Sequence, residues 1–238
     1  MNCNQNEGRI ELIIGPMFSG KSTRLIESIR KYTYKAKKTI IINYYSVKIY
    51  SDKQEVVTHE QIKYDSLDLK NLTDSFEILK SYDVIGIDEG QFFPDLVEIC
   101  EKLALLNKIV IIAALNGDYK MEPFPVISKI ISKADKIKLL KAYCFNCHKD
   151  AEFSLRIVQS NELVLIGAGE SYQPACRECH KYFSAEREKG NLNIDKILKN
   201  KENKENTPIE EKMIWHESSS GGETPNTSTK EMAQISHK

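Results

Sequence analysis

The sequence predicts an α/β fold in which a largely parallel sheet is followed by a small cysteine-rich unit and a disordered C-terminal tail. Three observations lead to this prediction. Short apolar, β-branched runs recur along the first part of the chain, with enough residues between them for helical crossovers. Helical periodicity fills two of the intervals between these runs. The composition then changes twice, first to cysteine-rich and then to polar.

Four apolar runs have the length and composition of buried strands, and they cover residues 10–14, 39–42, 84–87 and 109–114. Residues 21–32 follow the first run and place Leu25, Ile26 and Ile29 at helical spacing. Residues 95–106 carry a similar apolar stripe between the third and fourth runs. Alternating strands and helices are typical of a parallel sheet, so we expect residues 8–142 to form one α/β domain.

Charge and hydropathy narrow the class of protein. The chain has 238 residues, with 34 acidic and 34 basic ones, so no overall field draws it to nucleic acid or to an anionic membrane. No run approaches the roughly 20 apolar residues that cross a bilayer, and the polar start lacks the apolar core of a secretory signal. We therefore expect a cytoplasmic protein with neither a membrane nor a nucleic-acid partner.

Residues 15–22, GPMFSGKS, match the pattern GxxxxGKS between a predicted strand and a predicted helix. Backbone N–H groups of such a loop face phosphate oxygens at a helix N-terminus. Lys21 is expected to contact the β and γ phosphates of ATP, and the Ser22 hydroxyl is expected to ligate Mg²⁺. A strand-to-helix turn with a surface lysine is the alternative. The predicted fold is thus of the P-loop (RecA-like) kind, with a phosphate site made of Gly15, Pro16, Met17, Phe18, Ser19, Gly20, Lys21 and Ser22.

Two carboxylates, Asp88 and Glu89, follow the apolar run at 84–87. Burying them at a strand end would be costly without a nearby cation. We therefore predict that Asp88 holds Mg²⁺ together with Ser22, and that Glu89 is a catalytic base acting on the attacking oxygen. Two solvated acids at a strand end remain the alternative, and these residues alone do not separate an ATPase from a kinase.

Four of the six cysteines form two CxxC pairs on either side of residues 148–175: Cys144 with Cys147, and Cys176 with Cys179. Four thiolates suit tetrahedral Zn²⁺, and a closed four-sulfur shell indicates a structural ion. Four unrelated reduced cysteines are the alternative. We predict a zinc-ribbon-like domain over residues 143–187, in which the metal clips the base of a long loop. Residues 188–238 lack apolar clusters and are predicted to be disordered.

Three sequence motifs carry a resemblance to a known family. GPMFSGKST at 15–23, IGIDEGQFFPD at 85–95 and the doubled CxxC occur in the order found in thymidine kinases of animal cells, poxviruses and many bacteria, and residues 9–183 resemble that family. The resemblance implies ATP-dependent phosphorylation of the 5′-hydroxyl of thymidine, and of deoxyuridine, in pyrimidine salvage. It implies that Glu89 is the general base, that Gln91 belongs to the ATP site, and that the protein is a homotetramer inhibited by dTTP.

The same resemblance implies a pyrimidine pocket with aromatic and aliphatic walls, as a flat base requires. Residues 163–172 resemble the family's lasso loop, whose backbone groups hydrogen-bond the pyrimidine edge; the zinc would hold this loop. Any one pocket residue alone is compatible with an ordinary core position. The implied substrate-binding residues are Met17, Phe92, Leu115, Tyr119, Phe124, Ser154, Leu163, Leu165, Gly167 and Tyr172.

The chain also departs from the family pattern. Val47 and Ile49 stand where the family usually has an aspartate and an arginine. Two alternatives therefore stay open: a zinc-containing P-loop ATPase acting on nucleic acid or a protein partner, and a catalytically weakened nucleoside-binding regulator. The doubled Lys-Glu-Asn at 201–206 resembles the KEN degradation signal, which predicts ubiquitin-ligase recognition of the tail, with chance occurrence as the alternative.

Overall fold

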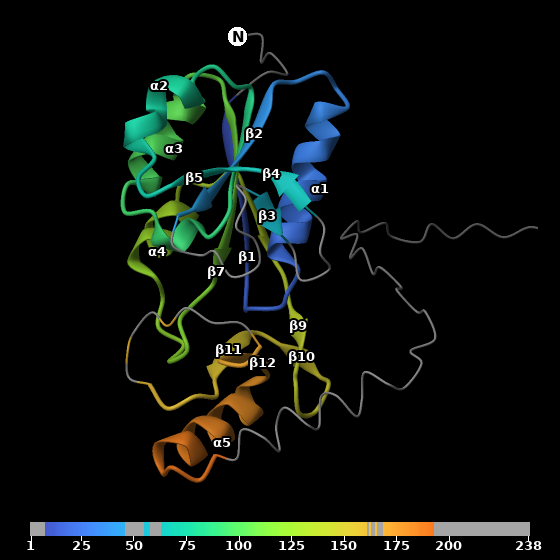
Figure 1. The fold of residues 1–238 in the computed structure, drawn as a ribbon, viewed down its shortest axis with the longest axis vertical. Helices are drawn as coiled ribbons and strands as arrows, with labels where there is room; N and C mark the ends of the chain where they lie inside the picture. The colour runs from blue at the N-terminus through green and yellow to red at the C-terminus, as the bar shows by residue number, and fades with distance from the viewer. Residues whose placement is uncertain are drawn as a thin grey trace, which may run out of the picture.

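The computed structural model describes residues 8–45, 55–57, 63–160, 162, 165 and 169–192, with backbone only for 55–57 and 63–65. A six-stranded sheet in the order β5-β2-β6-β7-β1-β8 forms its centre, and each pairing in this sheet is parallel. The predicted parallel α/β fold is therefore confirmed (Figure 1). The strands are β1 (Arg9–Gly15), β2 (Thr39–Tyr44), β5 (Leu67–Leu69), β6 (Val84–Ile87), β7 (Ile109–Leu115) and β8 (Lys136–Leu139).

Helices cover both faces of the sheet. Helix α1 (Lys21–Thr33) lies on one face, and α3 (Leu96–Leu105) and α4 (Pro125–Ile131) lie on the other (Figure 1). Side chains alternate between the two cores, so that Leu12 of β1 packs with α3 and the next residue, Ile13, packs with α1. A strand buried on both faces needs apolar residues on both of its sides, which explains why these runs are mainly apolar. The short segments η1 (Thr73–Ser75), α2 (Phe76–Leu79) and η2 (Gly90–Phe92) connect these elements.

The two outer strands were not among the predicted elements. All four side chains of β8 are exposed, and its sequence, KIKL, includes two lysines, as suits the edge of a sheet. Strand β5 has only three residues. Neither segment contains a long apolar run, so the pairing partner rather than the local sequence determines each strand.

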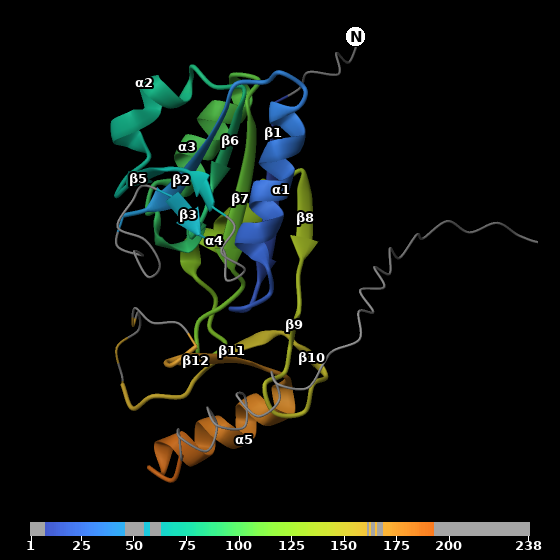
Figure 2. The ribbon, with the colours of Figure 1, turned by 45° about the vertical axis from the view of Figure 1, so that its right-hand side comes forward.

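The cysteine-rich part lies at one end of the sheet (Figure 2). It contains two antiparallel pairs, β9 (Ala142–Tyr143) with β10 (Asp150–Ala151), and β11 (Phe153–Arg156) with β12 (Tyr172–Ala175). Helix α5 (Arg177–Glu188) covers them, and a small core forms around Leu155, Ile157 and Ala175. Helix α5 was not predicted. A further antiparallel pair joins β3 (Glu55–Val57) to β4 (Lys63–Asp65).

The predicted tail at 188–238 is described only as far as residue 192, and its remainder lies outside the described residues. Among the helices that the structure describes, none combines the length and the hydropathy that a membrane span requires.

Candidate active site

The phosphate loop leaves the sheet at the end of β1 and enters α1 at Lys21. Gly20 caps this helix with a left-handed backbone, φ 77°, which favours glycine. Gly15 lies so close to the chain at Leu140 that a Cβ would be 2.6 Å from the carbonyl oxygen of that residue. The two glycines of the GxxxxGKS pattern are thus required by the turn and by close packing, and the first N–H groups of α1 are directed at the loop.

Lys21 is buried within this loop, and its Nζ donates a hydrogen bond to the Pro16 carbonyl at 2.7 Å. Burial lowers the pKa of Lys21, while the nearby carboxylates of Glu89 and Asp88 oppose that shift. Ser19 also donates to the Pro16 carbonyl, at 2.8 Å. The structure therefore places Lys21, which is predicted to contact phosphate, close to the two predicted acids, Asp88 and Glu89.

Asp88 directly follows β6 and is only 4% exposed. The Ser22 hydroxyl hydrogen-bonds its carboxylate, and the Glu89 N–H donates to Oδ1 at 3.0 Å. Burial and the charge of Glu89 raise the pKa of Asp88 to about 7. A divalent cation beside the Ser22 hydroxyl would favour the charged carboxylate again, so this pair of oxygen ligands fits Mg²⁺.

Glu89 has a left-handed backbone, φ 54° and ψ 39°, which is unfavourable for a residue with a side chain. Gln91 Nε2 donates to Glu89 Oε2 at 2.5 Å, and the Leu115 N–H donates to Gln91 Oε1 at 3.0 Å. The Gln91 amide therefore ties the Glu89 carboxylate to the end of β7. The spacing of residues in the sequence gave no indication of this bracing, and the role of Gln91 in ATP binding stays a prediction.

Some residues of the predicted base pocket lie on or beside the strands of the parallel sheet. The ring of Phe92 meets Phe124 edge-on, with centroids 6.4 Å apart. Tyr44, at the end of β2, packs at 5.3 Å against Phe92 and was not among the predicted residues. Leu115 ends β7 at the same carboxyl end of the sheet where Asp88 follows β6.

The other part comes from the cysteine-rich side. Ser154 of β11 accepts a hydrogen bond from the Met17 N–H at 2.9 Å, which connects this strand to the phosphate loop. Tyr119 and Tyr172 are both buried, and the Tyr172 hydroxyl donates to the Leu165 carbonyl at 3.1 Å. Four residues singled out in the sequence lie outside the described residues: Leu163, Gly167, Val47 and Ile49.

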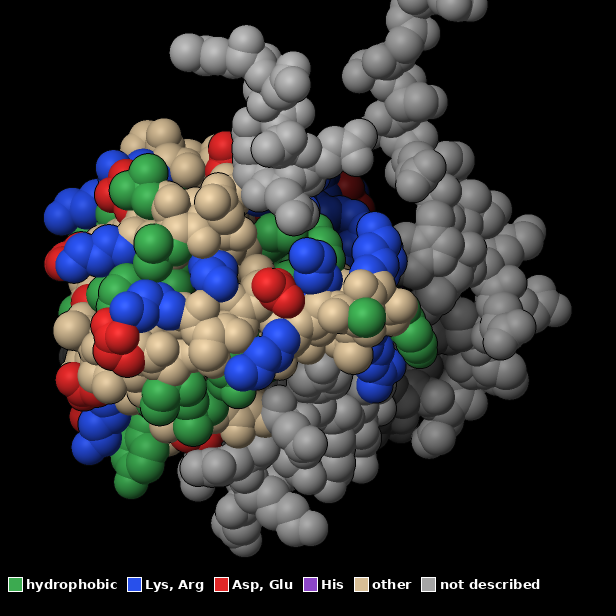
Figure 3. Space-filling model, turned by 90° about the horizontal axis from the view of Figure 1, so that it is seen from above, with side chains coloured by type: hydrophobic (Ala, Val, Ile, Leu, Met, Phe, Trp, Pro, Cys, Tyr) green, Lys and Arg blue, Asp and Glu red, His purple; other side chains and the backbone are tan. Residues whose placement is uncertain are grey.

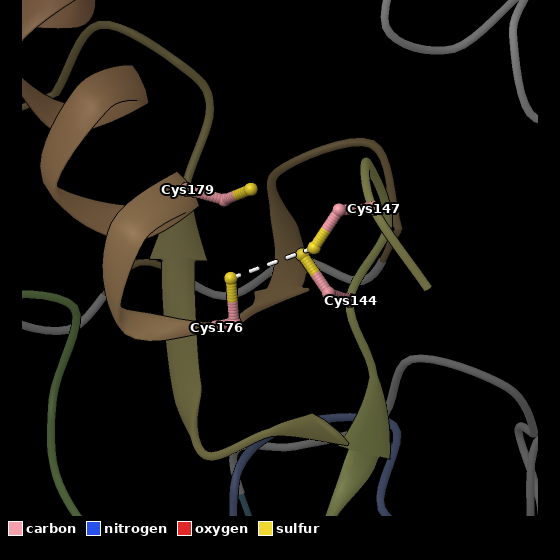
Figure 4. A group of neighbouring side chains, drawn as sticks. All are labelled: Cys144, Cys147, Cys176 and Cys179. Carbon is pink, nitrogen blue, oxygen red and sulfur yellow. Dashed lines mark hydrogen bonds between the residues drawn. The ribbon is translucent and has the colours of Figure 1, made fainter. Parts of the chain in front are cut away.

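The four cysteines converge on one point. Cys144 and Cys147 lie on the turn after β9, and Cys176 and Cys179 lie at the start of α5 (Figure 4). Their sulfur atoms are all within 4.8 Å of one another, and Cys147 Sγ is 3.6 Å from Cys176 Sγ. Zinc–sulfur bonds of about 2.3 Å in a tetrahedron place the sulfurs about 3.8 Å apart, so the cluster fits a structural Zn²⁺.

The thiol of Cys144 is already biased toward the thiolate that a metal requires. Although burial opposes it, hydrogen bonds from backbone groups of Cys147, Cys176 and Asn146 lower its pKa to about 7. The N-terminus of α5 adds a favourable partial charge beside Cys176 and Cys179.

A parallel sheet with a glycine-bearing strand-loop-helix and a buried carboxylate at the end of a nearby strand is the arrangement of the P-loop fold. The family model for thymidine kinase matches residues 8–180, and the chain belongs to the thymidine kinase family. It is 42% identical over 194 residues to thymidine kinase 1 of Dictyostelium discoideum, covering 80% of this chain and 84% of that one. It is 43% identical over 175 residues to the thymidine kinases of Vaccinia virus (strain Ankara) and Monkeypox virus, covering 74% of this chain and 98% of each relative.

Among solved structures, the flagellar accessory protein FlaH from Methanocaldococcus jannaschii matches 66% of this chain and 75% of its own, with 14% identity. The TM-score of 0.40 is too low for this similarity to bear on the fold or the function.

Proposed function

We propose that this chain transfers the γ-phosphoryl group of ATP to the 5′-hydroxyl of thymidine. Membership of the thymidine kinase family and 42–43% identity to proteins named thymidine kinases support the proposal. The observation that carries it is the position of Glu89, which Gln91 holds beside buried Lys21 and Asp88 at the phosphate loop. A kinase needs a base that accepts the proton of the attacking hydroxyl, and a carboxylate fixed at this place suits that role.

Each residue of the cluster has one task in this reaction. The loop N–H groups and Lys21 bind the ATP phosphates. Ser22 and Asp88 would hold Mg²⁺, which neutralises phosphate oxygens when bound. Glu89 accepts the proton of the 5′-hydroxyl while that oxygen forms a bond to the γ phosphorus, and the bond from phosphorus to the β–γ bridging oxygen breaks to release ADP. The products are thymidine monophosphate and ADP.

The proposed pocket determines which nucleoside reacts. Phe92 and Phe124 meet edge-on and form an aromatic wall of the proposed pocket, which we expect to accept a single pyrimidine ring. Thymidine is expected to react best, deoxyuridine less well because it lacks the methyl contact, and purine nucleosides poorly. The test incubates purified protein with Mg·ATP and each deoxynucleoside and measures the monophosphate formed. Efficient phosphorylation of deoxyguanosine would contradict the pocket assignment, and ATP hydrolysis without nucleoside product would contradict the kinase assignment.

The face of the molecule shown in Figure 3 gives no support to an ATPase that acts on nucleic acid. On the face shown in Figure 3, lysine and arginine side chains lie among aspartate, glutamate and hydrophobic ones over the described residues. Mixed charges of this kind do not make the extended basic surface that a phosphate backbone requires. In the same assay, an ATPase of that class would be stimulated by added DNA or RNA, whereas the proposed kinase is not.

The proposal extends to the assembly and regulation of the enzyme. The zinc is structural, the enzyme is a homotetramer, and it works in the cytoplasm, where reduced cysteines are available to bind metal. The end-product dTTP inhibits because it carries a base for the pocket and phosphates for the loop. Residues 201–206, outside the described residues, are the proposed site of ubiquitin-ligase recognition. Sedimentation of the purified enzyme tests the homotetramer, and inhibition kinetics with dTTP test the inhibition by the end product.

A further inference from the structure

Strand β11 presents its two faces to different parts of the molecule. Leu155 and the adjoining Ile157 belong to the core that includes the four cysteines. Because side chains alternate along a strand, Ser154 and Arg156 share the opposite face. Ser154 accepts the hydrogen bond from the Met17 N–H of the phosphate loop. Arg156 is therefore directed to the side of β11 that faces the proposed active site.

Arg156 is completely buried and connects several segments. Its Nη1 donates to the carbonyls of Ser160, at 3.3 Å, and of Glu162. Its Nη2 donates to the Tyr172 hydroxyl at 2.5 Å, and that hydroxyl in turn donates to the Leu165 carbonyl. One guanidinium thus holds the chain just after β11 and the tyrosine that begins β12.

The same guanidinium also stacks on aromatic rings. Its Cζ lies 3.8 Å from the centroid of Tyr119 and 5.2 Å from that of Tyr172. A buried charge is costly unless other polar groups replace water, and here two carbonyls, one hydroxyl and two ring faces do so. Lysine has neither the planar fork nor the flat stacking surface for this arrangement. These contacts require an arginine at position 156, and a different positively charged side chain would not make them.

We propose that Arg156 is a positioning residue of the nucleoside site, which stacks on Tyr119 and holds Tyr172 and the carbonyls of Ser160 and Glu162 in place. The inference rests on the proposed function, since Tyr119 and Tyr172 are proposed pocket residues. Arg156 makes none of the contacts of Lys21, Asp88 and Glu89 described above. Its loss therefore weakens thymidine binding without altering the ATP site.

The chain contains a matched control pair away from the active site. Arg9 donates through Nη2 to the Tyr32 hydroxyl, and its Cζ lies 5.9 Å from the centroid of that ring. Arg9 begins β1 and Tyr32 is in the last turn of α1, whereas the phosphate loop joins the other ends of these elements. An arginine–tyrosine pair of the same chemistry is thus present where no effect on substrate binding is expected.

The experiment uses the full-length, zinc-loaded protein and compares R156K, Y172F and the double variant with R9K and Y32F. Thymidine is varied at saturating Mg·ATP, and ATP is varied at saturating thymidine. We expect R156K and Y172F each to raise the thymidine KM about tenfold or more, the value of a lost charged hydrogen bond. The ATP KM and kcat stay within about twofold, and the double variant resembles the single ones because both break one linkage. R9K and Y32F leave all three constants near those of the wild type.

Several outcomes overturn the inference. R156K with a lower melting temperature but an unchanged thymidine KM shows a packing role only. Equal increases in both KM values, or additive effects in the double variant, show that Arg156 does not act through Tyr172 on the nucleoside site. If R156K does not fold or bind zinc, Y172F, which retains the ring, decides the question by its own thymidine KM. A wild-type protein that does not phosphorylate thymidine at all overturns the proposed function instead, and this inference with it.

Discussion

Replacing Asp88 by asparagine removes a buried charge while keeping the shape of the side chain. The carboxylate is 4% exposed and accepts hydrogen bonds from the Ser22 hydroxyl and the Glu89 N–H. Burial and the charge of Glu89 raise its pKa from 3.8 to about 7 in the folded protein without Mg²⁺. The folded state therefore holds a proton on Asp88 at pH values where the unfolded chain has already released it.

The sign of the pH effect follows from this difference. Because the folded-state pKa is the higher one, the contribution of Asp88 to wild-type stability falls as the pH rises from about 4 to about 7 and then levels off. Three pKa units at 1.36 kcal/mol each make ionised Asp88 unfavourable by roughly 4 kcal/mol above that range. Asparagine avoids this cost but weakens two hydrogen bonds, by roughly 1–2 kcal/mol in total. D88N is therefore expected to be about 2–3 kcal/mol more stable than the wild type near pH 8, a difference that shrinks or reverses near pH 4.

The assay is denaturant unfolding of both proteins in magnesium-free buffer at several pH values. Both proteins contain the same other titrating groups. The contributions of those groups therefore cancel in the difference between the two unfolding free energies. Mg·ATP should then stabilise the wild type much more than D88N, because ligand binding to the folded state adds stability only where the site is intact. A D88N variant that is less stable than the wild type by the same amount at every pH would refute the reasoning.

Two other predictions concern the base and the metal. E89Q should leave ATP and thymidine binding nearly unchanged but lower kcat by about a hundredfold or more, the usual contribution of a positioned base; turnover like that of the wild type would exclude Glu89 as the base. Metal analysis should find zinc bound by the four cysteines, and C147S or C179S should mainly lower stability and thymidine affinity. Activity that survives strong chelation in a zinc-free preparation would show that the metal is not required.

Several features were predictable because their signals are local. The GxxxxGKS pattern, the acids after the run at 84–87 and the doubled CxxC each occupy a short window of sequence. The mainly apolar runs predicted four strands of the sheet because strands buried on both faces have no polar side. The convergence of the four cysteines also followed from spacing, since each CxxC places two sulfurs on one turn.

Helix α5 shows where local patterns fail. Its buried positions include His180 and Arg187, so the stripe that faces the core is partly polar and produces no apolar periodicity. His180 Nε2 lies 3.0 Å from the Tyr119 carbonyl oxygen, and Arg187 Nη1 donates to the Arg156 carbonyl. These partners are distant in the sequence. Only the packed structure shows that the buried polar side chains of α5 have hydrogen-bond partners.

The sequence by itself determined the fold class, the GxxxxGKS loop, the two acids and the two CxxC pairs, because each of these signals is built from short local patterns. Only the tertiary structure decided how these parts meet. The hydrogen bond from Met17 to Ser154 joins residues 137 positions apart, and the link from Gln91 to Leu115 depends on the neighbouring ends of β6 and β7. Strand order and packing create such contacts, so the bracing of Glu89 and the buried position of Arg156 appear only once the chain is folded.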